Sequence, residues 1–280
     1  MNSFMGLSDR IYVAGHRGLV GSALVRQLQA LGYTNLILRT HTELDLEDSQ
    51  AVSRFFACEK PDFVFLAAAK VGGILANSTY PADFIRSNLN IQNHVIQASF
   101  EQGVKRLLFL GSSCIYPKLA PQPIQESSLL TGPLEPTNRA YALAKIAGIE
   151  MCRAYNVQYG TQYLCAMPTN LYGLNDNYDL EHSHVLPALI RRFHEAALTQ
   201  SGQVTLWGTG TPRREFLYSD DLANACVRLM NLQAEVFATF LFPEEMAEAV
   251  PLINIGCGED VTIKELASLV QDVTGFQGEV

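Results

Sequence analysis

Two short stretches of the sequence carry side chains that could move protons. In GSSCIYP, the hydroxyl groups of Ser112 and Ser113 stand beside the thiol of Cys114, directly after an apolar run. In YALAK, Tyr141 and Lys145 are four residues apart, which places both on one face of a helix. An ammonium group close to a phenol lowers the pKa of the phenol, so Tyr141 could exchange a proton with an alcohol or a ketone. Taken alone, such a pair is more often a surface tyrosine beside a solvated lysine.

A glycine-rich turn near the amino terminus could hold phosphate. Gly15, Gly18 and Gly21 follow the apolar run IYVA, and apolar residues then recur at helical spacing in VGSALVRQLQALG. Glycines at this spacing let the backbone turn sharply and approach a pyrophosphate, while the amino terminus of the following helix supplies N–H donors and a positive dipole. The turn therefore predicts a dinucleotide site.

The end of the second predicted strand indicates which dinucleotide binds. An acidic residue there accepts a hydrogen bond from the ribose 2′-hydroxyl of NAD, whereas a basic residue accommodates the 2′-phosphate of NADP. The sequence has Arg39 and His41 at this point and no acid before Glu43, and Arg17 lies in the glycine-rich turn. We therefore predict NADP, although a single exposed arginine is often only a solvated charge.

These residues need a scaffold, and the chain shows short β-branched or aromatic runs that alternate with longer helical patterns. We expect strands at residues 11–15, 35–39, 62–69, 105–113, 163–168, 204–208 and 253–256. The alternation predicts an α/β fold with a Rossmann-type, doubly wound parallel sheet. We assign residues 1–171 to an NADP-binding Rossmann domain. Residues 172–280 then form a smaller substrate-binding lobe, interleaved with the first domain and, we expect, truncated at its carboxyl end.

Composition narrows the class of protein. The formal net charge is −8 and the isoelectric point is about 5.3, which argues against a nucleic-acid partner. The six cysteines form no CxxC pair, so we expect reduced thiols. We find neither a signal peptide nor an apolar run long enough to span a membrane, and we expect a cytoplasmic protein.

Three motifs in order, GHRGLVG, GSSCIYP and YALAK, resemble the extended short-chain dehydrogenase/reductase family over nearly the whole chain. The resemblance implies an NADP-dependent oxidoreductase. It also implies that the Ser112 hydroxyl binds the reacting oxygen, that Tyr141 acts as the acid, and that Lys145 is its electrostatic partner.

Further motifs resemble the members of this family that form GDP-L-fucose from GDP-4-keto-6-deoxy-D-mannose: AAAKVGGI, EPTNRAYALAKIAG, MPTNLYG and SHVLPALIRRFHEA. This resemblance implies an NADPH-dependent epimerase/reductase that needs no metal, with Cys114 and His184 as its acid/base pair. A ketone acidifies the hydrogens on both neighbouring carbons, which is the chemistry that two inversions require. The GDP-sugar contacts implied are Arg192, Trp207 and Arg214.

The predicted cofactor contacts lie in the glycine-rich turn, after the second strand, and at the ends of later strands. They are Gly15, His16, Arg17, Gly18, Leu19, Val20, Gly21, Arg39, His41, Leu110, Gly111, Ser112, Ser113, Lys145, Pro168, Thr169, Asn170, Leu171 and His184.

Several alternatives stay open. Cys114 could be a small buried hydrophobic residue, and His182 competes with His184 for the role of acid. The protein could be another nucleotide-sugar epimerase or reductase, or a non-catalytic NADP-binding protein. A dehydratase is disfavoured because Ser113 and Cys114 stand where that reaction needs two acids.

A homodimer is expected because the helices predicted at 83–102 and 139–158 carry apolar residues on more than one face. These residues are Phe84, Leu89, Ile91, Val95, Ile146, Ile149 and Met151.

Overall fold

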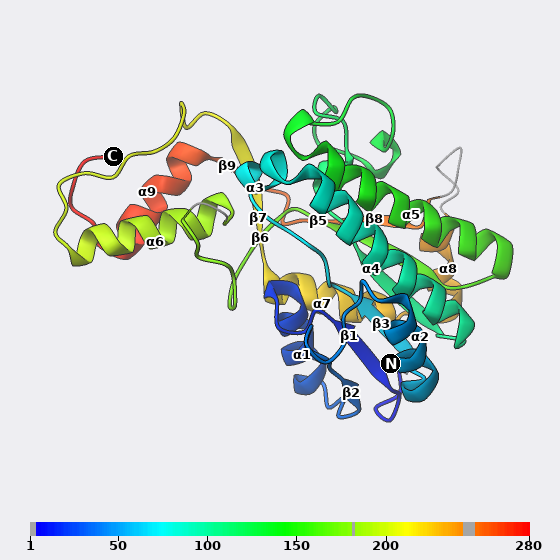
Figure 1. The fold of residues 1–280 in the computed structure, drawn as a ribbon. Helices are drawn as coiled ribbons and strands as arrows, with labels where there is room; N and C mark the ends of the chain where they lie inside the picture. Colours follow the sequence, from blue (N-terminus) through cyan, green and yellow to red (C-terminus); the bar gives the residue numbers. More distant parts are fainter. Residues whose placement is uncertain (1–3, 181–182, 243–249) are drawn as a thin grey trace.

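A computed structural model describes residues 4–180, 183–242 and 250–280 of the chain. Its main sheet has six strands, all parallel, in the order β2-β1-β3-β4-β5-β8 (Figure 1). The strands are β1 (Ile11–Ala14), β2 (Leu36–Ile37), β3 (Phe63–Leu66), β4 (Arg106–Leu110), β5 (Tyr163–Pro168) and β8 (Leu252–Ile255). This order confirms the predicted Rossmann-type, doubly wound sheet. The strand order reverses between β1 and β3, which is where such sheets bind ligands.

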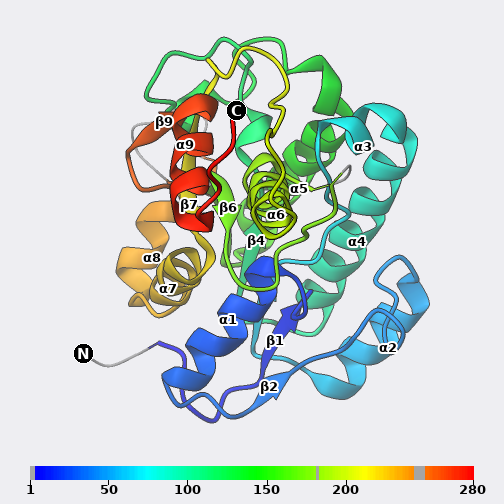
Figure 2. The same cartoon turned by 90° about the vertical axis from the view of Figure 1, so that its left-hand side faces the viewer.

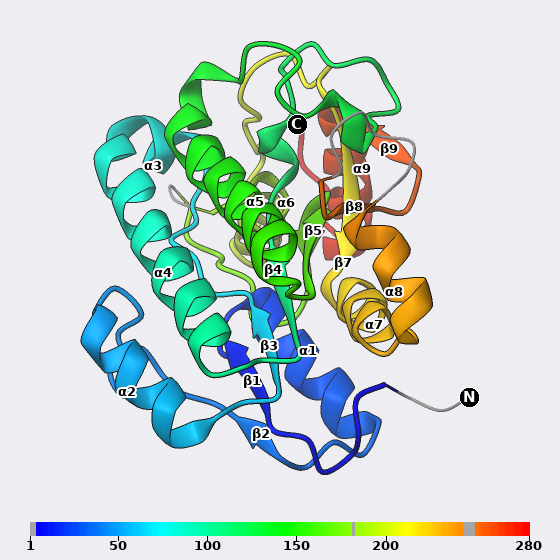
Figure 3. The same ribbon diagram turned by 90° about the vertical axis from the view of Figure 1, so that its right-hand side faces the viewer.

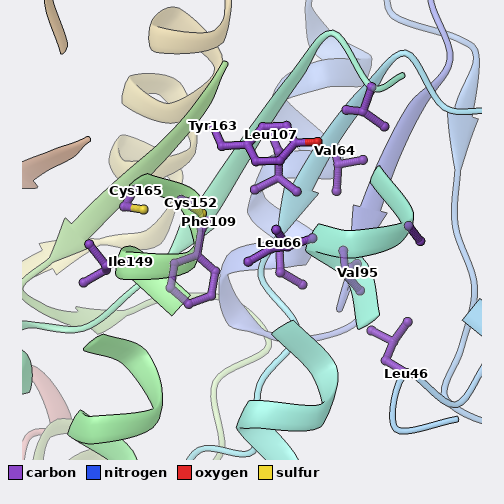
Figure 4. Packing of buried hydrophobic residues seen from close by; sticks show 14 of the residues in the cluster. Leu46, Val64, Leu66, Val95, Leu107, Phe109, Ile149, Cys152, Tyr163 and Cys165 are labelled. Carbon is purple, nitrogen blue, oxygen red and sulfur yellow. The ribbon is translucent and has the colours of Figure 1, made fainter. Parts of the chain in front are cut away.

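Helices cover both faces of this sheet (Figures 2 and 3). One face carries α1 (Leu19–Ala30), α7 (Ser219–Met230) and α8 (Ala234–Leu241), and the other carries α2 (Ser49–Glu59), α4 (Pro81–Glu101) and α5 (Arg139–Tyr159). In β4, Leu107 and Phe109 pack toward α4 and α5 (Figure 4), whereas Leu108 packs toward the opposite face. Because β4 is buried on both faces, its residues 107–110 are all apolar instead of apolar at alternate positions.

The second half of the chain builds a smaller lobe beside the sheet. It contains a three-stranded sheet of β6 (Asn170–Tyr172), β7 (Arg213–Tyr218) and β9 (Asp260–Thr262), together with α6 (Val185–Leu198) and α9 (Ile263–Thr274). The two helices share an apolar core in which Phe193 and Phe276 lie 5.6 Å apart between ring centroids. Figure 1 shows α6 and α9 side by side, away from the main sheet.

The lobe and the Rossmann sheet are interleaved along the chain. Helices α7 and α8 and strand β8 follow the first part of the lobe in sequence, yet they pack on or join the main sheet. The chain then returns to the lobe as β9 and α9, and α9 begins with a capping box between Thr262 and Glu265. Among the described residues, no helix has both the length and the apolar character needed to cross a membrane.

The strand expected at 204–208 does not form. Val204 is buried in the lobe core and its N–H bonds to the carbonyl of Glu279, but only an isolated bridge between Gln203 and Glu279 is present there. The residue types of the run VTLWG, which are β-branched, apolar or aromatic, predicted a strand. A strand also needs a partner over several residues, and the pattern of one segment does not reveal whether a partner exists.

Candidate active site

A cavity of about 690 Å³ lies at the carboxyl ends of the parallel strands. It contains most of the predicted cofactor residues: Gly15, Gly18, Leu19, Val20, Gly21, Arg39, His41, Leu110, Gly111, Ser112, Ser113, Lys145, Pro168, Thr169, Asn170, Leu171 and His184. His16 and Arg17 do not line it. Of the other predicted catalytic residues, Tyr141 lines the cavity and Cys114 does not. Residues from both halves of the chain therefore meet at the switch point between β1 and β3.

The glycine-rich turn has two glycines that the fold itself requires. Gly15 has a φ of +84°, and a Cβ there would lie 2.8 Å from the backbone nitrogen of Ala68. A Cβ at Gly21 would lie 2.1 Å from the carbonyl oxygen of Gly15. Both positions exclude larger residues because β1, α1 and the loop after β3 approach closely.

Gly18 differs from Gly15 and Gly21, because no protein atom occupies the space that a side chain at this position would take. Its φ is −76°, and a Cβ there would meet only the oxygen of Gly15 at an ordinary 3.5 Å. Gly18 is the N-cap of α1, makes no side-chain cap, and is followed by no acidic residue in the first turn. The turn thus leaves backbone N–H groups and a positive helix end facing a cavity, an arrangement that fits a phosphate group.

Positive charges gather where β2 ends. Arg39 lines the cavity, pairs with Glu59 on α2, and donates a hydrogen bond of 2.9 Å to the carbonyl of Leu38. His41 lines the cavity and lies 3.8 Å from Asp45. Arg17 is exposed outside the cavity lining. The same end of the sheet therefore presents at least one arginine to the cavity.

Ser112, Cys114 and Tyr141 come together after β4. Burial raises the pKa of the Cys114 thiol, while the Ser112 hydroxyl and the Lys145 ammonium oppose that rise. Burial and the nearby Cys114 raise the pKa of Tyr141, and the Ser112 hydroxyl again acts in the opposite direction. The Ser112 hydroxyl thus acts on both the thiol and the phenol. Cys114 is half-buried beside the residues that line the cavity.

The expectation that Lys145 lowers the pKa of Tyr141 is wrong in this structure. The Lys145 ammonium donates a hydrogen bond of 2.7 Å to the carbonyl of Leu110 and lies 4.6 Å from the ring centroid of Phe109. Burial lowers the pKa of Lys145 to about 8. Because burial and the nearby Cys114 outweigh the hydrogen bond with Ser112, the pKa of Tyr141 is raised, and the phenol keeps its proton at neutral pH. A neutral phenol is a proton donor.

His184 enters the cavity from the lobe. It is the N-cap residue of α6, and it lines the cavity together with Asp176. Burial lowers the pKa of His184, and the Asp176 carboxylate opposes that effect. His182, its competitor in the sequence, lies outside the described residues.

The three residues predicted to contact a GDP-sugar lie in the lobe, outside the cavity lining. The Arg192 guanidinium is 4.6 Å from the ring centroid of Trp207, whose side chain is 71% exposed. Arg214 is exposed on β7 and donates a hydrogen bond of 2.7 Å to the carbonyl of Arg213. Arg192 and Trp207 thus form one stacked pair, and Arg214 extends from a separate strand.

Three runs of cavity residues were not predicted. They are 44–47 after β2, 67–72 after β3 and 175–177 after β6, and the single residues Tyr12, Ile91 and Ser183 also line the cavity. The sequence AAAK was interpreted as the end of a strand, but β3 stops at Leu66 and the alanines form a loop. Small residues just past a parallel strand, at the switch point, were the signal that could have identified this loop.

Comparison with known proteins agrees with this geometry. Residues 11–238 match the family described as "NAD dependent epimerase/dehydratase family". The chain is 58% identical to GDP-L-fucose synthase 1 of Arabidopsis thaliana, covering 100% of this chain and 82% of that protein. It is 55% identical to GDP-L-fucose synthase of Escherichia coli K12, covering 97% and 83%.

Solved structures show the same similarity. A GDP-L-fucose synthetase from Naegleria fowleri bound to NADP is 28% identical, with a TM-score of 0.85 and coverage of 99% of this chain and 81% of that one. A GDP-6-OMe-4-keto-L-xylo-heptose reductase from C. jejuni is 42% identical, with a TM-score of 0.91 and coverage of 98% and 86%.

Proposed function

This chain belongs to the NAD dependent epimerase/dehydratase family, and we propose that it converts GDP-4-keto-6-deoxy-D-mannose into GDP-L-fucose. The reaction is an epimerisation at C3 and C5 followed by NADPH-dependent reduction at C4. High identity with GDP-L-fucose synthases of plants and bacteria supports this substrate. The observation that carries the proposal is that Tyr141 and His184 line one cavity that begins at a phosphate-binding turn, with Cys114 close to Tyr141 just outside the lining.

NADP(H) is the cofactor, and the residues present fit it. Gly18 and the uncapped start of α1 suit a pyrophosphate, and Arg39 suits a 2′-phosphate. The hydroxyl of Thr169 is buried at the end of β5 without a hydrogen-bond partner in the described structure, which leaves a polar atom available to a ligand. When bound, NADPH supplies the hydride for C4.

The epimerisation moves protons without changing oxidation state. We assign Cys114 as the base that removes a proton from a carbon beside the ketone, leaving an enolate whose charge lies on the C4 oxygen. His184 returns a proton to the opposite face of that carbon. Ser112 and Tyr141 donate hydrogen bonds to the oxygen while it carries charge. The Lys145 ammonium lowers the cost of forming the Cys114 thiolate.

The reduction needs one proton in addition to hydride. We assign Tyr141 as its donor, because its raised pKa keeps the phenol protonated and because it lines the cavity beside Ser112. Lys145 holds its place through the carbonyl of Leu110 and contributes positive charge where the alkoxide forms.

A reductase of a related GDP-4-keto sugar is the second candidate, favoured by the similarity to the C. jejuni heptose reductase. Incubation of the protein with GDP-4-keto-6-deoxy-D-mannose and NADPH in D₂O separates the possibilities. The proposal expects NADPH oxidation, followed at the nicotinamide absorbance band, with deuterium at C3 and C5 of the product. Oxidation without deuterium indicates a simple reductase, and NADPH binding without oxidation indicates a non-catalytic protein.

Substitution of Gly18 tests where the phosphates lie. Gly18→Val should raise the KM for NADPH at least about tenfold, because the new side chain takes the space of the pyrophosphate. The melting temperature should stay close to that of the wild type, since no protein atom fills that space. Gly15→Val is the matched comparison and should lower the melting temperature, because its left-handed backbone and Ala68 leave no room. An unchanged KM in Gly18→Val would contradict this placement.

We also propose a homodimer formed through α5. Phe84, Val95 and Ile149, which suggested a dimer, are buried in the protein's own core and offer no surface. An outward stripe on α5 supports the proposal instead, with exposed apolar residues at helical spacing: Leu143, Ala147, Ala154 and Val157. One charged residue, Glu150, stands in the middle of this stripe and pairs with Arg153. Figure 3 shows α5 on the outside of the molecule.

Charge placed on this stripe should separate the subunits. In light scattering, the double variant Leu143→Glu/Val157→Glu should have the mass of one chain, and the wild type the mass of two. Val273→Glu, at an 87% exposed residue of α9, is the control and should leave the dimer intact. A wild type that is monomeric at micromolar concentration would rule the dimer out.

We propose a cytoplasmic location and no nucleic-acid partner. All six cysteines are free, including exposed Cys58 and Cys257, as expected in a reducing compartment. The net charge of −8 disfavours association with a polyanion.

A further inference from the structure

The segment between β6 and α6 is fastened to the cofactor-binding helix. Asn175 adopts a left-handed backbone conformation with a φ of +66°, and its side-chain amide donates a hydrogen bond of 3.1 Å to the Ser22 hydroxyl on α1. Ser22 in turn donates to the carbonyl of Leu19, in the first turn of the same helix. Figure 2 shows this segment passing the amino-terminal end of α1. The next residue, Asp176, is thereby held at the cavity.

Asp176 and His184 line the cavity from the two ends of this segment. The Asp176 carboxylate accepts a hydrogen bond of 2.8 Å from the backbone N–H of Asn177, which limits its orientation. Asp176 is half-buried, and the charged side chain that acts on it is His184. The carboxylate is therefore partly shielded from solvent and lies in the same cavity as the imidazole.

His184 needs such a partner if it is to donate a proton. It is the N-cap residue of the 14-residue helix α6, where the positive end of the helix dipole disfavours a cation. Burial disfavours the imidazolium as well, and lowers the pKa of His184. A carboxylate in the same cavity acts against both effects.

Other charged groups near the cavity are less able to stabilise the imidazolium form of His184. Those that line it, besides Asp176 and His184, are Arg39, His41, Asp45, Glu47, Lys70, Tyr141 and Lys145. The two acids among them follow β2, where Asp45 faces His41 and Glu47 pairs with Arg86. On α6 itself, Arg191 and Arg192 are directed to the carbonyls of Tyr178 and Leu180.

We propose that Asp176 is a positioning residue for His184: from the same cavity, its carboxylate stabilises the imidazolium that returns a proton to the substrate carbon. The inference rests on the proposed function, since it assigns the partner of the proposed acid. Asn175 contributes by fastening the segment to α1, so the cofactor helix and the acid are held in one arrangement.

The variant Asp176→Asn tests the pair. In this variant the pKa of His184 should fall, so that at pH values above the pKa the imidazolium population is about tenfold lower than in the wild type. The pKa is followed by NMR through the imidazole resonance of His184, which is assigned with His184→Gln. The alkaline limb of solvent-deuterium exchange into the substrate should move to lower pH by the same factor. NADPH binding should be unchanged. Asp176→Glu should restore part of both shifts, because it restores the charge.

Asp179→Asn is the matched control, because Asp179 belongs to the same segment but lies outside the cavity lining and acts on Arg191. It should leave the pKa of His184 and the pH profile unchanged. An unchanged pKa of His184 in a folded Asp176→Asn protein would overturn the inference. If the wild type performs no exchange at all, the proposed function fails, and the NMR titration still decides whether Asp176 and His184 form a pair.

Discussion

A Cys114→Ala variant is expected to bind NADPH like the wild type and to exchange the C3 and C5 hydrogens of the substrate about 10²- to 10⁴-fold more slowly. The variant removes the group that we propose as the base for each inversion, while Ser112, Tyr141 and Lys145 remain at the cavity. Exchange is measured by mass spectrometry after incubation in D₂O, and NADPH binding by fluorescence titration.

The product distribution sharpens this test. Because Tyr141 still supplies its proton, the variant should reduce the C4 ketone without inverting its neighbours. Cys257→Ala is the control, since this exposed thiol lies outside the cavity lining and should not affect exchange. Exchange at the wild-type rate in Cys114→Ala would show that another group is the base and that Cys114 is only a half-buried hydrophobic residue.

Burial explains why exchange should depend strongly on this one thiol. The pKa of Cys114 is raised by its surroundings, so little thiolate forms unless a positive charge is near. Lys145 supplies that charge, and its own pKa is lowered to about 8 by burial. As pH rises past this value, Lys145 loses its proton and its support of the thiolate weakens. The two groups are therefore coupled through one cavity.

Much of the fold could be predicted because its signals are local. The apolar runs that became β1, β3, β4 and β5 are short and bounded, and a parallel sheet with helices on both faces follows from their alternation with helical patterns. Gly15 and Gly21 were recognisable for the same reason, since their spacing reports a tight turn before a helix.

Other features depend on contacts between distant segments. Arg106 is fully buried in β4, its guanidinium 3.5 Å from the ring centroid of Phe4 and 3.9 Å from that of Phe237. It donates hydrogen bonds to the carbonyls of Met230 and Leu232, more than a hundred positions away in sequence. Nothing local marks this arginine as a core residue.

The site shows the same limit. Tyr141 and Lys145 could be recognised as a pair from their spacing, but the direction in which the pKa of Tyr141 shifts could not be predicted. That direction depends on burial and on the nearby Cys114, which together outweigh the hydrogen bond with Ser112. Asp176 could not be identified either, because its importance depends on the position of His184 across a loop.

The variant Tyr141→Phe should show the complementary defect. It should oxidise NADPH about 10²- to 10⁴-fold more slowly, because no donor of comparable position protonates the C4 oxygen, yet it should still exchange substrate hydrogens with D₂O. Tyr116→Phe is the matched control, since its phenol bonds to Asn254 at 2.6 Å and lies outside the cavity lining.

Together, the two variants test whether Cys114 and Tyr141 serve different steps more strictly than either variant does alone. If Cys114 serves the inversions and Tyr141 the reduction, Cys114→Ala loses exchange and keeps oxidation, whereas Tyr141→Phe loses oxidation and keeps most of its exchange. Tyr141 also helps to hold the enolate oxygen, so some loss of exchange is expected, within about tenfold for one hydrogen bond of about 1 kcal/mol. Equal loss of both activities in Tyr141→Phe would mean that the phenol is needed to form the enolate, and Ser112 alone could not then be the group that stabilises it.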